Sequence, residues 1–330
     1  MAANISSEKI DLLIYGPIRP ILENGFPDQF VVHRAESGEQ LNGLAPDVKQ
    51  KLRGMAVTYH TMHTGKAEMS QFPRLEMVAS FGVGYDHIDA AWAGSRGIIV
   101  TNTPDVLTEE VADATLGLLL CTVRELSQAE RYLRAGKWPE KPYPLTGATL
   151  RDRTIGLVGM GRIGKAVARR LEAFGVPVVY HTRRARPDVG YRHYPDLIAM
   201  ARDVDTLVVI VPGGAETRHL INAEVLRALG PKGILVNVAR GSVVDEPALI
   251  KALQERTIYA AGLDVYAHEP AVPEELLAME HVVLLPHVGS ASLHTRTKMD
   301  QLVVDNIVSW FAGHGPLTPV PETPWPPIRE

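Results

Sequence analysis

Residues 154–165 read TIGLVGMGRIGK. An apolar run leads into Gly159, Gly161 and Gly164, whose spacing is G-x-G-x-x-G, and residues 166–171 continue at helical spacing. In such a strand-turn-helix unit, the first glycine permits a tight turn, the second lets the backbone approach a pyrophosphate, and the third brings helix and strand close. The helix N-terminus then faces the anionic diphosphate. The segment predicts a dinucleotide-binding turn, although glycines also cluster in turns that bind no ligand.

The end of the next predicted strand, residues 176–180, indicates which dinucleotide binds. A site that prefers NAD places Asp or Glu about twenty residues beyond the glycines, where it accepts a hydrogen bond from the ribose 2′-hydroxyl. This chain has His181-Thr182-Arg183-Arg184 there. The guanidiniums of Arg183 and Arg184 offer paired donors that match phosphate oxygens, whereas a carboxylate would repel a 2′-phosphate. We therefore expect NADP(H) to be preferred, with NAD(H) possible; the alternative is a solvated basic loop.

Size and composition restrict which kinds of protein and partner are possible. A chain of 330 residues, of which 45% are apolar, predicts two domains. The formal net charge of −4 gives no basic footprint and argues against nucleic acid as a partner. The single cysteine, Cys121, lies in an apolar helical run, so we expect neither a disulfide nor a metal centre. Neither a secretory signal nor a membrane span is recognisable, and we expect a cytoplasmic protein that does not associate with membranes.

Short apolar runs recur along the chain and are separated by turn residues and helical patterns. This spacing predicts strands that alternate with helices, and hence parallel sheets covered on both faces. The expected fold is α/β, with two doubly wound parallel-sheet domains, one flavodoxin-like and one Rossmann. The predicted strands outside the glycine-rich unit are 12–15, 30–32, 55–58, 77–79, 98–100, 207–211, 234–238, 260–263 and 282–285.

Two longer helical patterns predict how the domains are connected. One helix is expected to begin at Thr108, with acids in its first turn, and to run towards Gly136. A final amphipathic segment, 293–311, is expected to pack back on the first domain. The substrate-binding (catalytic) domain would then be discontinuous, comprising residues 1–103 plus 292–330, and the NAD(P)-binding domain would comprise 104–291. A ligand is expected in the cleft between them.

Three polar residues, Arg240, Glu269 and His287, each follow an apolar run at a predicted strand end, where open α/β sheets bind ligands. Ketone reduction by a nicotinamide needs a cation to hold and polarise the substrate, which suits Arg240. It also needs a proton donor, which suits His287, and a carboxylate to orient that donor, which suits Glu269. Taken singly, each residue has an ordinary structural interpretation: a turn cap, a solvated acid or a satisfied loop histidine.

Further motifs extend over nearly the whole chain, and with them it resembles the D-isomer-specific 2-hydroxyacid dehydrogenases, especially the glyoxylate/hydroxypyruvate reductase and hydroxyphenylpyruvate reductase branch. The motifs are SFGVGYDHID at 80–89, VTNTP at 100–104, NVARG at 237–241, VDE at 244–246, GLDV at 262–265 and LPHVGS at 285–290.

The resemblance implies a catalytic set of Arg240, Glu269 and His287, and a homodimer. It implies that the backbone N–H groups of Val83 and Gly84 bind the substrate carboxylate, with Arg240 and His287 also on the substrate. The cofactor-binding residues expected from the motifs and the resemblance together are Thr108, Gly159, Gly161, Arg162, Ile163, Gly164, Arg183, Arg184, Pro212, Thr217, Val238, Asp264 and Gly289.

The leading hypothesis is an NADPH-dependent reductase that converts small 2-oxo acids, such as glyoxylate or hydroxypyruvate, to D-2-hydroxy acids. One alternative is a hydroxyphenylpyruvate or other aromatic 2-oxo acid reductase; another is a non-catalytic, nucleotide-sensing protein of the corepressor type. Formate dehydrogenases fit less well because their histidine is paired with Gln and not with an acid such as Glu269. Departures at 58–65 and 211–217 leave the side-chain pocket and the Thr217 contact open, and Trp138 lies in a loop that in relatives reaches a neighbouring subunit.

Overall fold

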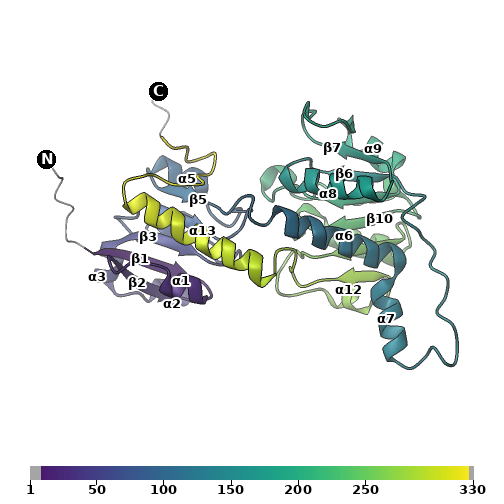
Figure 1. The fold of residues 1–330 in the computed structure, drawn as a ribbon, viewed down its shortest axis with the longest axis horizontal. Coiled ribbons are helices and arrows are strands. Elements are labelled where there is room, and N and C mark those ends of the chain that lie inside the picture. Colours follow the sequence, from purple (N-terminus) through teal and green to yellow (C-terminus); the bar gives the residue numbers. More distant parts are fainter. Residues whose placement is uncertain (1–8, 327–330) are drawn as a thin grey trace. The chain divides into compact units, whose positions relative to one another are not determined.

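The computed structural model describes residues 9–326 and divides into two compact units (Figure 1). Unit 1 consists of Met1–Leu107 with Leu293–Glu330, and unit 2 of Thr108–Ser292. Each unit contains one parallel sheet with helices, which confirms the predicted α/β fold class. The roles assigned above to the two domains stay predictions.

The sheet of unit 1 has five parallel strands in the order β2-β1-β3-β4-β5. Its strands read as near-continuous apolar runs because both faces are covered. The strands are β1 (Ile10–Tyr15), β2 (Phe30–Ala35), β3 (Leu52–Val57), β4 (Met77–Ser80) and β5 (Ile99–Thr101), and the helices are α1 (Pro20–Asn24), α2 (Gly38–Asn42), α3 (Pro46–Lys51), α4 (Lys66–Met69), α5 (Ala90–Ser95) and α13 (Leu293–Phe311).

Helix α13 returns the chain to unit 1, as its amphipathic pattern predicts. It contacts α1 and β4, and it buries Met299, Val303 and Ile307. A Cβ at Gly54 of β3 would lie 3.1 Å from the ring of Phe311, so the small residue leaves room for the end of the helix. The tail beyond α13 pairs with β5, where the N–H of Val320 donates to the carbonyl of Val100 at 3.0 Å.

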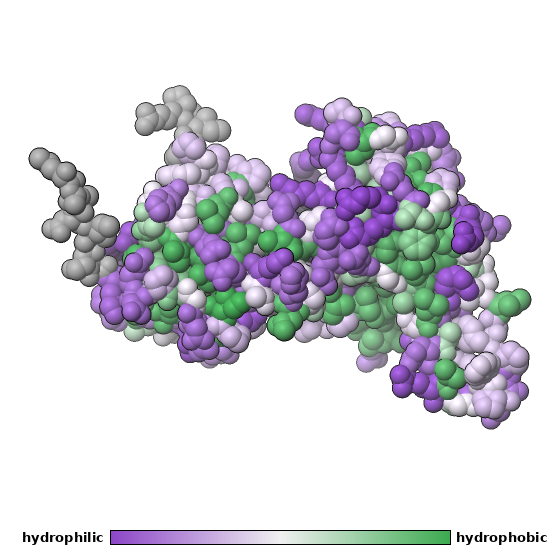
Figure 2. Space-filling view, viewed as in Figure 1, coloured by the Kyte–Doolittle hydropathy of each residue, from purple (hydrophilic) through white to green (hydrophobic). Residues whose placement is uncertain are grey.

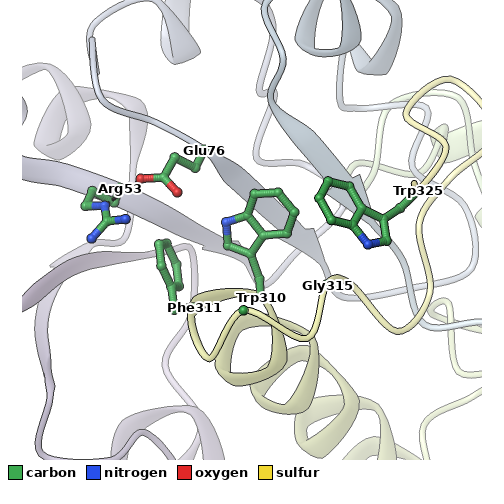
Figure 3. Close-up of a pocket in the computed structure, with 7 residues that line it drawn as sticks. Arg53, Glu76, Trp310, Phe311, Gly315 and Trp325 are labelled. Carbon is green, nitrogen blue, oxygen red and sulfur yellow. Dashed lines mark hydrogen bonds and ion pairs between the residues drawn. The ribbon is translucent and has the colours of Figure 1, made fainter. Parts of the chain in front are cut away.

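A shallow hollow of about 260 Å³ lies where α13 ends (Figure 3). The rings of Trp310 and Trp325 meet edge to face, with centroids 5.1 Å apart. A Cβ at Gly315 would lie 2.3 Å from Nε1 of Trp325, so the chain passes directly over that indole. Arg53 and Glu76 form an ion pair at 2.5 Å on the other side of Phe311. These contacts hold the C-terminal segment on unit 1.

The sheet of unit 2 has seven parallel strands in the order β12-β11-β10-β9-β6-β7-β8. The chain runs outward from β6 to β8 on one side and from β9 to β12 on the other, so the direction of winding reverses between β6 and β9. In open α/β sheets, ligands bind at such a switch point. The strands are β6 (Ile155–Val158), β7 (Val178–His181), β8 (Arg192–Tyr194), β9 (Thr206–Val209), β10 (Ile234–Asn237), β11 (Ala260–Leu263) and β12 (Val282–Leu284).

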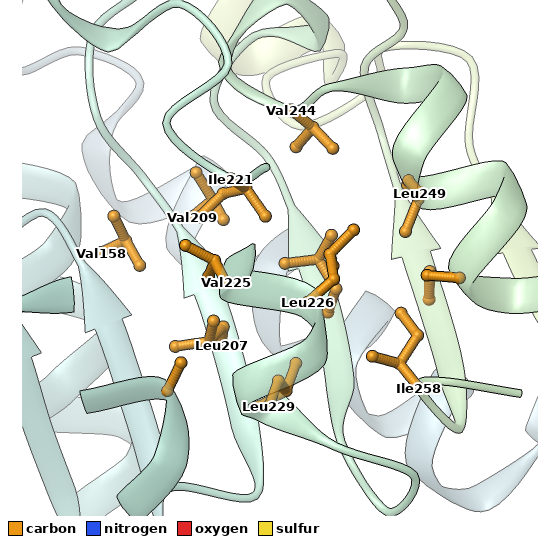
Figure 4. Packing of buried hydrophobic residues seen from close by; sticks show 14 of the residues in the cluster. Val158, Leu207, Val209, Ile221, Val225, Leu226, Leu229, Val244, Leu249 and Ile258 are labelled. Carbon is orange, nitrogen blue, oxygen red and sulfur yellow. The ribbon is translucent and has the colours of Figure 1, made fainter. Parts of the chain in front are cut away.

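Two hydrophobic cores cover the faces of this second sheet. Alternate residues of β9 divide between them: Leu207 and Val209 belong to one core, and Val208 to the other. Figure 4 shows the first core, in which α10 packs its Leu226 and Leu229 against the strands. The helical segments of this unit are α6 (Thr108–Arg124), α7 (Leu126–Arg134), α8 (Arg162–Ala173), α9 (Leu197–Asp203), η1 (Ala215–Thr217), α10 (Ala223–Leu229), η2 (Gly241–Val243), α11 (Glu246–Gln254) and α12 (Glu274–Ala278).

The prediction of one helix from Thr108 towards Gly136 is wrong, because two helices, α6 and α7, occupy this segment. Glu125 has a left-handed φ of 53°, which separates α6 from α7. The hydroxyls of Tyr143 and Tyr259 donate to the two carboxylate oxygens of Glu125 at 3.0 and 3.1 Å. These long-range contacts hold the residue that interrupts the helix, and the local periodicity carries no sign of them.

Within residues 9–326, no helix combines the length and the apolar character that crossing a membrane requires.

Candidate functional site

The glycine-rich turn lies between β6 and α8, beside the switch point. Gly159 has a φ of 110°, and a Cβ there would lie 2.7 Å from the carbonyl oxygen of Ile210, just after β9. A Cβ at Gly164 would lie 2.5 Å from the carbonyl oxygen of Gly159. Because rigid backbone atoms fill both spaces, both positions require glycine.

Gly161 is the N-cap residue of α8, and unlike Gly159 and Gly164 it faces open space. Among the described residues, nothing lies within 4 Å of where its Cβ would stand. The first N–H groups of a helix have no partner within the helix, and they carry the positive end of its dipole. The open space at Gly161 therefore fits close approach of an anionic diphosphate, whereas the other two glycines serve packing.

His287 and Glu269 form a hydrogen-bonded pair at the carboxyl edge of the sheet. Nδ1 of His287 lies 2.7 Å from Oε2 of Glu269, and the two side chains are 25% and 12% exposed. The other carboxylate oxygen accepts the N–H of Tyr266 at 3.0 Å. Contacts at both oxygens fix the carboxylate, and the carboxylate in turn fixes the orientation of the imidazole.

Asp264, only 3% exposed at the end of β11, holds the loop that carries His287. Its carbonyl accepts the N–H of His287 at 2.9 Å, and its carboxylate accepts those of Val288 at 2.7 Å and Gly289 at 2.8 Å. Burial raises the pKa of this carboxyl, and the two N–H donors oppose that rise. His287 has a left-handed φ of 53°, a conformation that costs about 1–3 kcal/mol and that these bonds stabilise.

Arg240 follows β10 in an extended conformation and is half-buried. Asn237, which is 1% exposed, folds the turn around it: Nδ2 donates to the Arg240 carbonyl at 3.0 Å, and Oδ1 accepts the N–H of Ala239 at 3.1 Å. The sequence motif NVARG contains Asn237, but no role was predicted for this residue. A polar residue that ends an apolar strand is the signal that could have identified it as a positioning residue.

Gly241 joins the Arg240 turn to the loop that carries Glu269. A Cβ at Gly241 would lie 1.9 Å from the carbonyl carbon of Tyr266, so the two backbones touch. The hydroxyl of Tyr266 donates to the carbonyl of Leu285 at 2.9 Å, which connects the same loop to the segment before His287. Local backbone packing thus links the segments after β10, β11 and β12, which bear the three predicted catalytic residues.

The basic loop after β7 is exposed. The hydroxyl of Thr182 donates to the Arg184 carbonyl at 2.6 Å, and His193 Nε2 lies 2.8 Å from the Thr182 carbonyl. Arg183 forms an ion pair with Glu216 of η1, and the two side chains are 81% and 74% exposed. Paired guanidiniums on an exposed turn can bind a phosphate that arrives from solvent.

The other predicted cofactor residues lie at helix starts and in loops of unit 2. Thr108 begins α6, and Arg162 and Ile163 form the first turn of α8. Val238 follows β10. The Thr217 hydroxyl donates to the carbonyl of Pro212 at 2.7 Å, so it closes its own loop.

The predicted carboxylate-binding turn belongs to unit 1 and follows β4. Gly82 has a φ of 132°, and its N–H donates to Oγ1 of Thr103 at 3.0 Å. Nδ2 of Asn102 donates to the Val83 carbonyl at 2.8 Å. Two contacts from the segment after β5 thus shape the turn that contains Val83 and Gly84, and their role towards a substrate stays a prediction.

Residues 116–289 match the family model described as "D-isomer specific 2-hydroxyacid dehydrogenase, NAD binding domain". A glyoxylate/hydroxypyruvate reductase of Arabidopsis thaliana is 44% identical over 314 residues, which cover 95% of this chain and 99% of the relative. A hydroxyphenylpyruvate reductase of Plectranthus scutellarioides is 41% identical with the same coverage.

One similar solved structure is an NADPH-dependent glyoxylate/hydroxypyruvate reductase from Sinorhizobium meliloti in complex with NADP and malonate. It is 52% identical to this chain, has a TM-score of 0.91, and is matched over 96% of this chain and 98% of that one.

Proposed function

Because the chain belongs to the D-isomer-specific 2-hydroxyacid dehydrogenase family, we propose that it reduces small 2-oxo acids, such as glyoxylate and hydroxypyruvate, to D-2-hydroxy acids with NADPH. The observation that carries the proposal is the 2.7 Å contact between His287 and Glu269, at the same carboxyl edge of the sheet as the glycine-rich turn. An oriented imidazole next to a carboxylate is the general acid that ketone reduction needs.

When bound, the nicotinamide supplies a hydride to the carbonyl carbon of the substrate. Because Glu269 engages Nδ1, His287 would give the accompanying proton to the carbonyl oxygen from Nε2. Arg240 would hold the substrate carboxylate and polarise the carbonyl group, with Val83 and Gly84 donating backbone N–H groups to the same carboxylate. The reaction consumes one 2-oxo acid, one proton and one NADPH, and it yields one 2-hydroxy acid and one NADP⁺.

The preference for NADPH is supported by Arg183 and Arg184 at the position where an NAD site has an acid. The Sinorhizobium meliloti relative, at 52% identity, is described as NADPH-dependent and was solved with NADP. The fit of the site to a dinucleotide rests on the open N-terminus of α8 at Gly161.

A homodimer is part of the proposal. Large apolar side chains are exposed on α7 and the loop that follows: Leu133 is 56% exposed, Trp138 64% and Leu145 100%. Figure 2 shows isolated hydrophobic residues among hydrophilic ones over α7. Single exposed apolar residues are ordinary on protein surfaces, so the dimer proposal rests on the family resemblance and not on this surface. Light scattering during size-exclusion chromatography tests this state, and a monomer at micromolar concentration would contradict it.

We also propose a cytoplasmic location, which the single cysteine supports and cell fractionation tests.

Steady-state kinetics on three substrates tests the main proposal. We expect kcat/KM to be larger on glyoxylate and hydroxypyruvate than on hydroxyphenylpyruvate, and larger with NADPH than with NADH. The reverse substrate order would assign the aromatic activity, which the 41% identical relative keeps as the second candidate. Tight nucleotide binding without turnover on any of the three would instead favour the nucleotide-sensing alternative.

A further inference from the structure

We propose that Glu216 sets how strongly this protein discriminates between NADPH and NADH, by competing with the 2′-phosphate for the guanidinium of Arg183. The inference rests on the proposed function, because it requires Arg183 to receive that phosphate. Glu216 would be a specificity-determining residue that touches neither the substrate nor the hydride.

The placement of the two residues supports this role. Arg183 follows β7, and Glu216 lies in η1 after β9; these two strands flank β6, whose C-terminal end leads into the glycine-rich turn. The ion pair between them therefore spans the position directly beyond that turn. A dinucleotide bound there would place its adenosine ribose near the basic loop.

Both partners are positioned by their own turns. The Thr217 N–H donates to the carbonyl of Gly214 at 3.2 Å, the Thr217 hydroxyl donates to that of Pro212 at 2.7 Å, and Gly214 has a φ of 136°. These bonds hold η1 and hence the backbone of Glu216. On the other side, Thr182 closes the turn that contains Arg183. The carboxylate thus meets the guanidinium because of local backbone geometry, although both side chains are largely exposed.

Charge then decides the outcome for each nucleotide. A monoester phosphate carries about −1.5 to −2 charges at neutral pH, so it both attracts Arg183 and repels the Glu216 carboxylate. NADPH must separate the ion pair before it can use the guanidinium. NADH has a neutral 2′-hydroxyl at this point and gains nothing from that separation. The carboxylate therefore weakens the binding of NADPH relative to NADH.

Equilibrium binding of NADP⁺ and NAD⁺, measured by calorimetry, tests the inference without relying on turnover. We expect Glu216→Gln to lower the Kd for NADP⁺ about threefold, the scale of an exposed ion pair, and to leave the Kd for NAD⁺ within error. Raising the ionic strength from about 0.05 to about 0.5 M should reduce the gain, because salt screens exposed charges. Glu224→Gln, which removes an exposed acid of α10, is the matched control and should change neither constant.

The Arg183→Ala background separates the two proposals. If Glu216 acts through Arg183, the double variant Arg183→Ala/Glu216→Gln should bind NADP⁺ no more than marginally better than Arg183→Ala alone. An unchanged Kd for NADP⁺ in Glu216→Gln would overturn the inference. If Arg183→Ala itself leaves the NADP⁺ preference intact, the phosphate-binding role of Arg183 fails instead.

Discussion

Two regions of the carboxyl edge of the second sheet are built in opposite ways. Beyond β10–β12, Glu269 and His287 are mostly buried, and each is fixed by at least two hydrogen bonds or backbone contacts. Beyond β7 and β9, Arg183 and Glu216 are more than 70% exposed and meet only at their tips. The first region suits proton transfer, which needs fixed geometry, and the second suits nucleotide selection, which needs charge and tolerates motion.

Among the substitutions considered, replacing the imidazole of His287 should reduce catalysis most. We expect His287→Gln to lower kcat at least about a hundredfold, because the general acid is lost while the fold is retained. The measurement is kcat on glyoxylate with saturating NADPH, with circular dichroism as the check on folding. His314→Gln, which changes an exposed histidine of unit 1, is the control. Near-wild-type turnover in a folded His287→Gln protein would rule out the proton-donor role.

A single methyl group should disrupt the same region through its backbone. Gly241→Ala would place a Cβ 1.9 Å from the Tyr266 carbonyl carbon, so the loop that carries Glu269 must move. We expect the free energy of unfolding to fall by about 1–3 kcal/mol and kcat to fall about tenfold. Urea unfolding and kinetics measure the two effects.

Gly117→Ala provides the matched glycine control, because no described atom lies within 4 Å of its would-be Cβ on the exposed face of α6. There the substitution should stabilise the helix by about 0.5–1 kcal/mol. Equal losses of unfolding free energy at positions 117 and 241 would show that the backbone contact at Gly241 does not contribute to stability.

In the exposed region beyond β7 and β9, removing charges should change the cofactor preference without changing the stability of the fold. We expect Arg183→Ala/Arg184→Ala to reduce the ratio of kcat/KM with NADPH to that with NADH about tenfold, since two charge-assisted contacts to the phosphate are lost. The melting temperature should stay within error of the wild type. Arg227→Ala, an exposed arginine of α10, is the control. An unaltered ratio would leave the solvated basic loop as the correct interpretation.

The same contrast explains what the sequence could and could not predict. Buried parallel strands such as β9 and β10 were located because both faces are apolar, so composition alone reveals them. Strand β8, Arg192–Tyr194, was missed because it lies at the sheet edge and is mostly polar. The chemistry of Glu269 and His287 suggested their pairing, and the fold supplies the 2.7 Å contact.

Long-range polar contacts were beyond the reach of local patterns. The ion pair between Arg183 and Glu216 joins residues 33 positions apart, and no local pattern indicates that their two turns meet. The break at Glu125 depends on Tyr143 and Tyr259, the latter 134 residues away along the chain. In both cases the sequence offered residue types of suitable chemistry, and the tertiary fold decided their partners.

The break between α6 and α7 gives the smallest and most specific prediction. Burial is the main cause that raises the pKa of Tyr143 from the ordinary 10.0 to about 12, and the hydrogen bond to Glu125 and the charge of its carboxylate add to the rise. A raised tyrosine pKa means that the stabilising contribution is complete below pH 10.0 and is lost as the pH rises towards about 12. Absorbance at 295 nm, taken as the difference between wild type and Tyr143→Phe, should show Tyr143 still mostly neutral at about pH 11.

Glu125→Gln should lower the pKa of Tyr143, because it removes the charge and keeps an acceptor. A difference titration centred at the ordinary value would mean that the Glu125 contact does not persist in solution, and the left-handed turn between α6 and α7 would then need another cause.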